Sequence, residues 1–279
     1  MPTPISSPQN DRIKNLVKLQ NRRQRDAQRL MLVEGVREAA LALANGFVPE
    51  EAYVCPELAK GVEATAVADQ LHHLETTGHC RLFTITPEVF GKVAYRGESG
   101  GVLLVIPYWA RPLASLLLPA NPFLVIIEGG EKPGNLGAIL RTADAAGVDA
   151  VIISETQTGE GTDIFNPNVV RASLGALFTV PVIAAPTGQV IAWLRERQIQ
   201  IAAATPEGEA LYTAVNLQNP VALVMGSEAT GLSQTWLDAA DTRLLIPMVG
   251  QIDSLNLSVS TALLLYEVVR QRNQANPIT

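Results

Sequence analysis

The stretch that decides the fold is VALVMGSEATGLS, Val221 to Ser233, followed by TRLLIPMVGQIDSLNLSVSTALLLYE, Thr242 to Glu267. Two apolar runs, Val221 to Met225 and Leu244 to Ile246, each lead directly into a loop of glycine and small polar residues. Such runs are typical of buried strands in a parallel sheet, and ligands bind beyond the carboxyl ends of those strands. The pattern predicts an α/β fold with a ligand site formed by these two loops.

The alternation of strands and helices extends back to residue 123. The run FLVII, residues 123–127, reads as a strand that is covered on both faces. A helix is expected from about Asn135 to Ala146, where Gly147 ends it, and a strand from Val151 to Ser154. A helix over 188–197 and a strand over 199–203 follow. The closing helix, about 257–272, is expected to carry apolar residues near one face that serves as core or subunit interface. These residues are Val259, Leu263, Leu264 and Val268.

A glycine-rich stretch, EGGEKPGNLGAILRTADAAGV, connects the first of these strands to the first helix. It lacks both G-x-G-x-x-G and the phosphate-binding loop G-x-x-x-x-G-K-[ST], which disfavours a nucleotide-binding Rossmann enzyme. Asn135 and Arg141 stand six residues apart, about 600° of helical rotation. They converge only if Asn135 lies in the loop or at the helix cap and Arg141 reaches back. Simple capping by Asn135 and a surface salt bridge of Arg141 are the structural alternatives.

In order and spacing, these three stretches resemble the motifs of the SpoU/TrmH-type RNA ribose 2′-O-methyltransferases, with Glu131 and Ser227 as small departures. The resemblance covers about 120–279 well and the N-terminal part more loosely. It implies a C-terminal α/β domain with a trefoil knot, and a homodimer whose active site draws on both subunits. It also implies S-adenosylmethionine as the methyl donor, structured RNA as the substrate (rRNA rather than tRNA), and no metal.

The resemblance also assigns roles to residues of the motifs. The catalytic candidates are Arg141, Asn135, Glu228, Ser254 and Asn256. Arg141 is expected to stabilise the developing alkoxide. A guanidinium is essentially always protonated and is therefore a poor general base. Glu228 would orient Arg141 or Asn135, or else favour a helix N-terminus, while Ser254 and Asn256 could equally cap the last helix. The candidates for holding the cofactor are Gly226, Ile246 and Leu255, with Met248 and Thr205 on the rim.

The N-terminal part shows a second, smaller α/β pattern. Residues 1–10 read as a loose tail, and residues 11–30 as one helix with a basic stripe of Lys18, Arg22, Arg25 and Arg29. The stripe is either a solvated face or a contact for RNA phosphates. The pattern divides the chain into residues 1–106, a proline-rich linker (107–121) and residues 122–279. The resemblance implies that the first part is an RNA-binding domain and the last part the catalytic domain. The family resemblance implies a ribosomal-protein-like fold for the first of these.

Composition limits the remaining alternatives. The chain of 279 residues is 47% hydrophobic and 17% charged with a net charge of −6, which indicates a compact protein without a whole-chain signature of nucleic-acid binding. Two cysteines, no apolar leader and prolines within the longest apolar stretch predict a soluble cytoplasmic protein. The group His72, His73, His79 and Cys80 lacks metal-ligand spacing. The main rival function is a catalytically inactive RNA-binding protein of the same fold.

Overall fold

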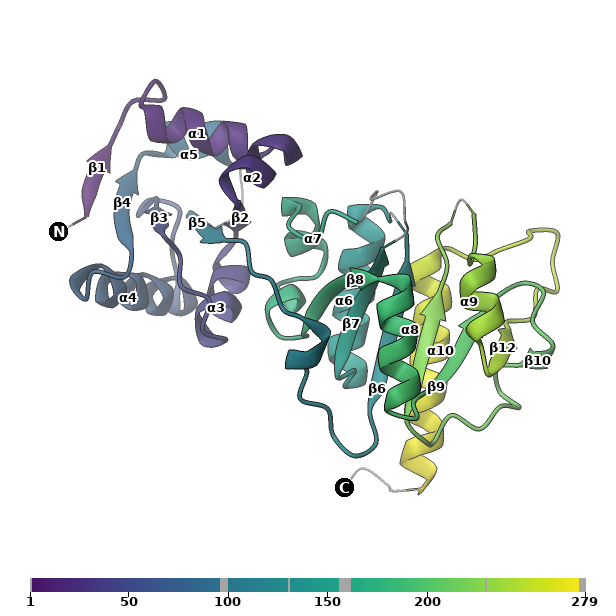
Figure 1. Cartoon of the computed structure of the whole chain (residues 1–279). Helices are drawn as coiled ribbons and strands as arrows, with labels where there is room; N and C mark the ends of the chain where they lie inside the picture. Colours follow the sequence, from purple (N-terminus) through teal and green to yellow (C-terminus); the bar gives the residue numbers. More distant parts are fainter. Residues whose placement is uncertain (1, 96–99, 130, 156–161, 229, 276–279) are drawn as a thin grey trace. The chain divides into compact units, whose positions relative to one another are not determined.

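The computed structural model describes residues 2–95, 100–129, 131–155, 162–228 and 230–275. Gly130 and Ala229, two positions of the quoted motifs, lie outside this set. Contacts divide the chain into two compact units (Figure 1). The N-terminal unit comprises Met1–Trp109 and Ile164–Thr179, and the C-terminal unit comprises Ala110–Asp163 and Val180–Thr279.

The N-terminal unit is a mixed five-stranded sheet with the strand order β1-β4-β3-β5-β2. Its strands are β1 (Thr3–Ile5), β2 (Leu30–Glu34), β3 (Glu51–Val54), β4 (Arg81–Ile85) and β5 (Val102–Pro107). Helices α1 (Asp11–Leu19) and α5 (Pro87–Val93) lie on one face, next to α2 (Arg22–Gln28), while α3 (Val36–Ala44) and α4 (Val62–Thr76) lie on the other (Figure 1). Helix α7 (Pro167–Ala172) and the 3-10 turn Ala176–Phe178 complete the unit. The predicted small α/β fold is confirmed.

Three predictions about the first thirty residues are wrong. Thr3–Ile5 is not a loose tail, because it pairs in parallel with β4 and buries Ile5. The expected single helix is two helices, since the side chain of Asn21 caps α2 by accepting a hydrogen bond from the Arg23 N–H. Arg25 does not belong to an exposed stripe: it is fully buried and donates to the carbonyls of Leu19 and Gln20 at 3.1 and 2.8 Å.

The C-terminal unit is a seven-stranded parallel sheet with the order β10-β12-β9-β11-β6-β7-β8. Its strands are β6 (Phe123–Glu128), β7 (Ala150–Glu155), β8 (Val182–Pro186), β9 (Gln200–Ala204), β10 (Ala210–Leu211), β11 (Val221–Met225) and β12 (Thr242–Leu245). Strand β11 has the predicted bounds, β12 begins and ends earlier than predicted, and β8 and β10 were not predicted. The predicted parallel α/β fold is confirmed.

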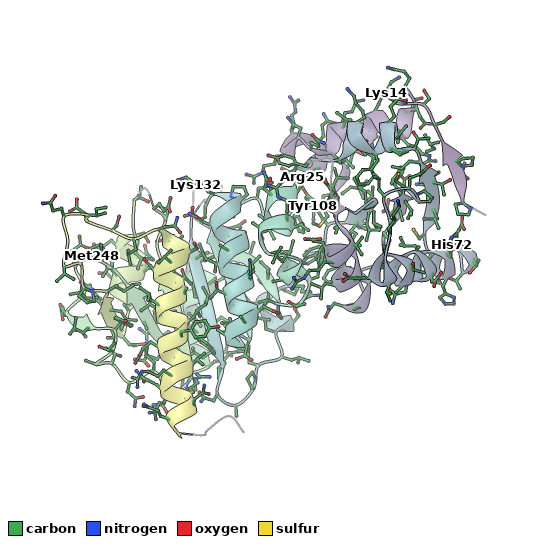
Figure 2. All side chains as sticks on the ribbon, turned by 180° about the vertical axis from the view of Figure 1, so that it is seen from behind. Lys14, Arg25, His72, Tyr108, Lys132 and Met248 are labelled. Carbon is green, nitrogen blue, oxygen red and sulfur yellow. The ribbon has the colours of Figure 1, made fainter. Side chains whose placement is uncertain are left out.

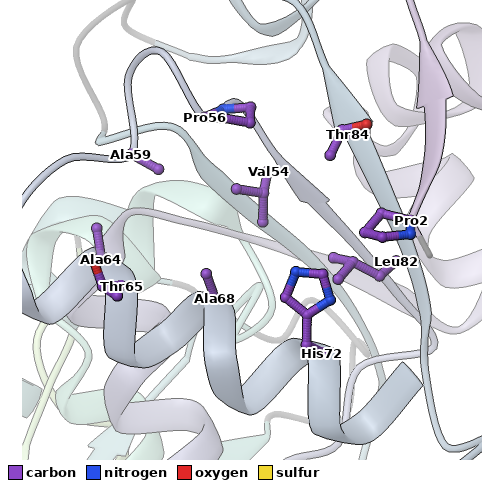
Figure 3. Close-up of a pocket in the computed structure, with 10 residues that line it drawn as sticks. All are labelled: Pro2, Val54, Pro56, Ala59, Ala64, Thr65, Ala68, His72, Leu82 and Thr84. Carbon is purple, nitrogen blue, oxygen red and sulfur yellow. The ribbon is translucent and has the colours of Figure 1, made fainter. Parts of the chain in front are cut away.

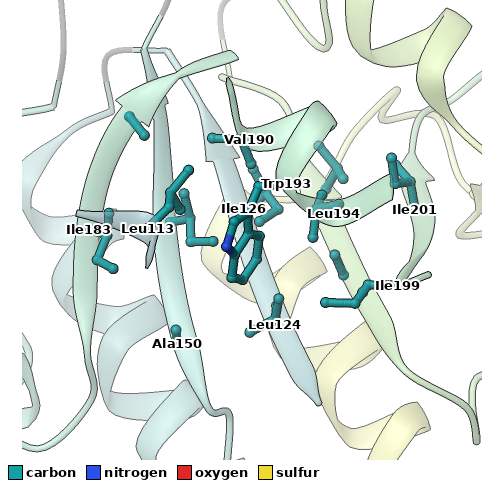
Figure 4. Packing of buried hydrophobic residues seen from close by; sticks show 14 of the residues in the cluster. Leu113, Leu124, Ile126, Ala150, Ile183, Val190, Trp193, Leu194, Ile199 and Ile201 are labelled. Atoms are coloured by element: carbon teal, nitrogen blue, oxygen red, sulfur yellow. The ribbon is translucent and has the colours of Figure 1, made fainter. Parts of the chain in front are cut away.

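Helices cover both faces of this sheet. Helices α6 (Pro133–Ala146) and α10 (Leu257–Ala275) pack side by side on one face, as both views show (Figures 1 and 2). Helices α8 (Thr187–Glu196) and α9 (Gln234–Ala239) lie on the other, where Trp193 and Trp236 belong to one core cluster with the aliphatic side chains of the central strands. Figure 4 shows Trp193 among these side chains. This double cover explains why the central strands read as continuous apolar runs.

The apolar residues of α10 do not share one face, contrary to prediction. Leu264 and Val268 are fully buried, whereas Val259 and Leu263 are 47% and 38% exposed. Tyr266 is also exposed, so a second apolar stripe faces away from the core. The described helices include none that is long and apolar enough to cross a membrane.

The histidines around α4 have separate surroundings. His72 lines a cavity of about 240 Å³ between α4 and the neighbouring strands, together with Pro2, Leu82 and mostly small side chains (Figure 3). The Nδ1 atom of His79 contacts the Thr77 hydroxyl at 3.0 Å, and Cys80 is buried. Within the described residues, no group of three or more His, Cys, Asp or Glu side chains is placed to hold a metal ion.

Candidate functional site

The five candidate cofactor residues lie in loops that leave one edge of the C-terminal sheet. Strands β12, β9 and β11 are neighbours, with Ala204 paired to Met225 on one side and to Leu244 on the other. Thr205, Gly226 and Ile246 follow these strands, and the Thr205 N–H donates to the Leu244 carbonyl at 3.1 Å. Parallel strands thus place the three loops side by side, as the sequence predicted for two of them.

The loop after β12 carries the other two candidates, Met248 and Leu255, and both side chains are exposed. Figure 2 shows Met248 and Lys132 at this end of the C-terminal unit. Thr205 is nearly buried, and its hydroxyl donates to the Glu207 carboxylate at 2.7 Å. This edge of the sheet therefore carries both strand-end backbone groups and a loop with exposed apolar side chains.

The fold of its own loop leaves no room for a side chain at Gly226. A Cβ atom at Gly226 would lie 2.3 Å from the carbonyl carbon of Gly231 and 2.5 Å from the nitrogen of Leu232. The loop after β11 folds back on its own first residue, with Ser227 and Gly231 bridged, and this close approach excludes a side chain.

A chain of hydrogen bonds joins the three motifs. Glu228 accepts from the Lys132 ammonium at 2.8 Å and from the Asn256 amide at 2.7 Å. The Nδ2 atom of Asn256 also donates to the side-chain Oδ1 atom of Asn135 at 3.0 Å. The Asn135 amide donates to Glu131 at 2.8 Å, and the same carboxylate oxygen accepts from the Lys132 N–H at 2.7 Å. These five residues form a closed ring, called here the motif ring.

The two asparagines in the motif ring have fixed orientations. A carboxylate only accepts hydrogen bonds, so the Nδ2 atoms of Asn135 and Asn256 must face Glu131 and Glu228. The Oδ1 atom of Asn256 then faces α10, where it accepts from the Ser258 N–H and hydroxyl at 3.0 and 2.6 Å. Asn256 therefore caps the last helix and contacts Glu228 at the same time. Its two sequence interpretations are compatible.

Asn135 does not cap a helix. It is the third residue of α6, whose N-cap position is Lys132. Asn135 and Arg141 were expected to converge only if Asn135 lay in the loop or at the helix cap. Both residues lie within α6, so Arg141 is about 9 Å further along the helix and about a third of a turn away around its axis. The two side chains of one chain therefore do not converge.

Arg141 and Ser254 lie outside the motif ring. Both are exposed, and neither makes a hydrogen bond or ion pair with any residue that the structure describes. The structural alternative for Arg141, a surface salt bridge, is not found among the described residues. The structure thus brings together Asn135, Glu228 and Asn256 from the five catalytic candidates.

The motif ring has a defined charge distribution. The Lys132 ammonium, which donates to the carboxylate, lowers the pKa of Glu228, and the same contact raises the pKa of Lys132. The Leu257 N–H, at the start of α10, approaches Glu228 at 3.4 Å and adds to this effect. Glu228 is therefore held as a carboxylate that accepts from three groups.

Sequence reasoning missed Lys132 and the support of Glu131. Glu131 is nearly buried, and its backbone N–H donates to the Thr162 hydroxyl at 3.0 Å. That hydroxyl in turn donates to the Gly129 carbonyl. Glu128, also buried, accepts from the Ser233 N–H at 2.7 Å and ties the loop after β11 to β6. Glu131 and Lys132 are adjacent charged residues in the glycine-rich stretch, and this pair was the sequence signal that could have identified both.

Comparison with known proteins agrees with this geometry. The sequence profile of the SpoU rRNA Methylase family matches residues 122–266, and that of an MRM3-like substrate binding domain matches residues 10–104. A putative TrmH family tRNA/rRNA methyltransferase of Staphylococcus haemolyticus is 41% identical over 152 residues, which are 54% of this chain and 59% of that protein. The chain thus matches less than two thirds of the length of this relative.

Two further similarities extend over most of the chain. The 23S rRNA (guanosine-2′-O-)-methyltransferase RlmB of Photorhabdus laumondii is 33% identical over 219 residues, 77% of this chain and 88% of that protein. The crystal structure of an AdoMet-bound rRNA methyltransferase from Sinorhizobium meliloti superposes with a TM-score of 0.85 at 28% identity, covering 96% of this chain and 97% of that one. The three motifs, their shared sheet edge and these matches lead to one conclusion: the chain belongs to the SpoU rRNA methylase family.

Proposed function

We propose that this protein transfers the methyl group of S-adenosylmethionine to a ribose 2′-hydroxyl of structured RNA, with ribosomal RNA as the substrate. The observation that carries the proposal is the motif ring, which connects Asn135, Glu228 and Asn256 from three separate stretches at the ligand-binding edge of the sheet. The relative from Photorhabdus is named for this reaction on 23S rRNA, and the Sinorhizobium structure contains the donor. The proposal places the protein in the cytoplasm.

The loops after β9, β11 and β12 fit the proposed donor. Met248 and Leu255 are exposed apolar side chains of the loop after β12, which leaves the same sheet edge as the backbone that follows Ala204 and Met225. A flat adenine needs such an apolar cover and main-chain hydrogen bonds. Thr205, Gly226, Ile246, Met248 and Leu255 would hold the adenosyl part. When bound, the sulfonium supplies an electrophilic methyl group, so the chain itself must position and activate the hydroxyl.

The catalytic residues would act on the ribose. A ribose hydroxyl is a weak acid, so the site must stabilise the charge that develops on its oxygen. The permanently protonated Arg141 stabilises this alkoxide and clamps a neighbouring phosphate, while a water or another acceptor takes the proton. Glu228 and Asn135, fixed by Asn256 in the motif ring, position the substrate, and Ser254 contributes a further hydroxyl.

The proposal includes a homodimer in which Arg141 completes the site of the partner subunit. Arg141 is exposed and has no hydrogen-bond partner among the described residues of its own chain. The exposed stripe of Val259, Leu263 and Tyr266 on α10 gives a second copy an apolar surface to cover. The loop after β12 returns across the sheet so that Asn256 reaches Glu228 and α10 packs on α6, which supports the proposed knot.

Methyl transfer to an unmodified 23S rRNA transcript tests the reaction. We expect transfer by the wild-type protein, and its loss in Arg141→Ala with the affinity for S-adenosylmethionine retained in calorimetry. Arg141→Lys should be a poor substitute because it lacks the bidentate geometry. RNA binding without transfer by the wild-type protein would instead support the inactive rival.

Mixed dimers test the placement of Arg141. Arg141→Ala and Asn256→Ala are each expected to be inactive. When they are mixed in equal amounts, half of the dimers contain one chain of each kind, and one of their two sites is intact if Arg141 acts across the dimer. The mixture should then recover about a quarter of the wild-type activity. No recovery after verified subunit exchange would place Arg141 in the site of its own chain.

A further inference from the structure

The N-terminal unit has an uneven charge distribution across its sheet. Helices α1, α2 and α5 carry seven basic residues (Arg12, Lys14, Lys18, Arg22, Arg23, Arg25 and Lys92) and three acidic ones (Asp11, Asp26 and Glu88). Helices α3 and α4, on the opposite face, carry one (Arg37) against four (Glu38, Glu63, Asp69 and Glu75). Figure 2 shows Lys14 and His72, one from each group of helices, on opposite sides of the sheet. A polyanion would therefore be attracted to one side of this unit.

Five of the seven cations on the basic side are exposed: Lys14, Lys18, Arg22, Arg23 and Lys92. The ammonium of Lys18 and the guanidinium of Arg23 are exposed and make no ion pair with a described residue. Lys14 lies 3.7 Å from the fully exposed Asp11, and Arg22 lies 3.5 Å from Asp26. Such exposed pairs contribute little and are readily exchanged for another anion. Arg12 is excluded, because it is paired with Glu51.

Hydrogen bonds of a buried arginine and of two amide side chains connect the helices that carry these cations. The buried Arg25 guanidinium binds the carbonyls of Leu19 and Gln20, where α1 ends. The amides of Asn15 in α1 and Gln28 in α2 donate to each other, both at 3.0 Å. A surface whose backbone is already ordered loses little conformational entropy on binding.

Aromatic contacts extend this support to the end of α2. The Tyr108 hydroxyl donates to Asp26 at 3.1 Å, and its ring stacks on Phe165. The guanidinium of Arg29, just after α2, lies 5.0 Å from the centre of the same ring. Arg29 is thus a positioned cation at the far end of the row that begins at Lys14.

We propose that this row of cations, Lys14, Lys18, Arg22, Arg23 and Arg29, binds the sugar–phosphate backbone of the substrate RNA. It is called the α1–α2 ridge. The inference rests on the proposed function and deepens it by assigning RNA contact to one face of the N-terminal unit. Phosphate contacts supply affinity and orientation without reading sequence, which suits a surface of lysine and arginine.

The composition of the α1–α2 ridge disfavours a protein partner. Stable protein interfaces have an apolar centre that is depleted in charge. Among the described residues of α1 and α2, Val17 is the one large apolar side chain that is exposed. The ridge instead presents charge along two successive helices, which matches a linear array of phosphates.

The test compares two double variants of the full chain that each remove two exposed positive charges from the N-terminal unit. Lys18→Gln/Arg23→Gln changes the ridge, and Arg37→Gln/Lys60→Gln is the matched control outside it. Binding to the unmodified 23S rRNA transcript is measured between 50 and 200 mM salt. Each phosphate contact contributes about 0.9 to the slope of log K against log salt, or about a 3.5-fold loss of affinity over this range. The ridge variant should lose about 1.8 from the slope, and the control should lose none.

Methyl-transfer kinetics separate this inference from the proposed function. The ridge variant should raise KM for the transcript at least tenfold, with a smaller effect on kcat and no effect on the affinity for S-adenosylmethionine. An unchanged slope and KM in an active enzyme would overturn the ridge and leave the methyltransferase proposal intact. Equal effects of the two double variants, or equally tight binding of polyglutamate, would also overturn it. Absence of transfer by the wild-type protein would contradict the function while the slopes still test the ridge.

Discussion

Substitution of Gly226 by alanine tests how the site is built. The new Cβ would meet the carbonyl carbon of Gly231 at 2.3 Å, whereas ordinary contacts begin near 3.4 Å. Because the opposing atoms are backbone, the loop that carries Glu228 must move by about 1 Å, the difference between these distances. Overpacking of this kind costs about 1–3 kcal/mol of stability, and a displacement of about 1 Å in a catalytic site can cost about 100-fold in rate.

Gly134→Ala is the matched control. A Cβ at Gly134 meets nothing within 4 Å, and the residue lies in the first turn of α6 beside Asn135. Its effect on stability should be between zero and about 1 kcal/mol of stabilisation, since glycine is a poor helix former. Urea unfolding followed by tryptophan fluorescence is suitable because Trp193 and Trp236 report on the C-terminal core. Wild-type stability and methyl transfer in Gly226→Ala would refute this explanation of the glycine.

Three further predictions concern single side chains. Asn256→Ser keeps a cap for α10 but loses both amide donations, so methyl transfer should fall at least about tenfold. Asn256→Ala removes the cap as well and should also lose about 1 kcal/mol of stability in urea unfolding. Equal stability of the two variants would contradict the capping role. The lowered pKa of Glu228 means that its stabilising contribution is complete above its unfolded pKa and is lost as the pH falls through its folded value. Lys132→Met removes the main cause of the lowered Glu228 pKa. In calorimetry between pH 8 and 4, the variant should therefore lose its affinity for S-adenosylmethionine at a higher pH than the wild-type protein. Loss of affinity at the same pH in both proteins would show that the Lys132–Glu228 pair does not set this pKa. Arg25→Met leaves the carbonyls of Leu19 and Gln20 without their donor and should lower the free energy of unfolding by about 1–3 kcal/mol. The control Lys14→Gln, at an exposed position, should lower it by less than about 0.5 kcal/mol. Urea unfolding monitored by circular dichroism compares the two variants.

The sequence predicts the C-terminal fold well because local and tertiary preferences agree there. The run Val221 to Met225 is apolar at every position, and β11 is buried at every position. The glycine at position 147 adopts a left-handed conformation and ends α6 as predicted. Strand β8 was missed because its apolar run is short and lies between Pro181 and Pro186, and β10 was missed because it has two residues.

Errors arose where a side chain has two possible environments. Helical periodicity places Arg25 in a row with Lys18 and Arg22, but it does not show that the chain turns at Asn21 and buries one member of the row. The cap signal of an asparagine before a polar helix was present at Asn21 and was not used. The side-chain pattern also contains no sign that Ile164–Thr179 packs with the N-terminal unit.

The site residues show the same limit. Motif spacing selects Asn135, Glu228 and Asn256, but their hydrogen bonds depend on the sheet order, which brings β11 beside β6. Lys132 has no motif of its own, and its pairing with Glu228, 96 positions away, follows from that same strand order. Sequence predicts which side chains matter more readily than which of them touch.

The most direct measurement is the chemical position of the transferred methyl group. The unmodified 23S rRNA transcript is incubated with the protein and methyl-labelled S-adenosylmethionine, and the RNA is then hydrolysed in alkali. A methylated 2′-oxygen cannot attack the adjacent phosphodiester, so ribose methylation predicts label in an alkali-resistant dinucleotide, and loss of that label with Arg141→Ala. Label recovered in mononucleotides, or no label in the RNA, would contradict the proposed reaction.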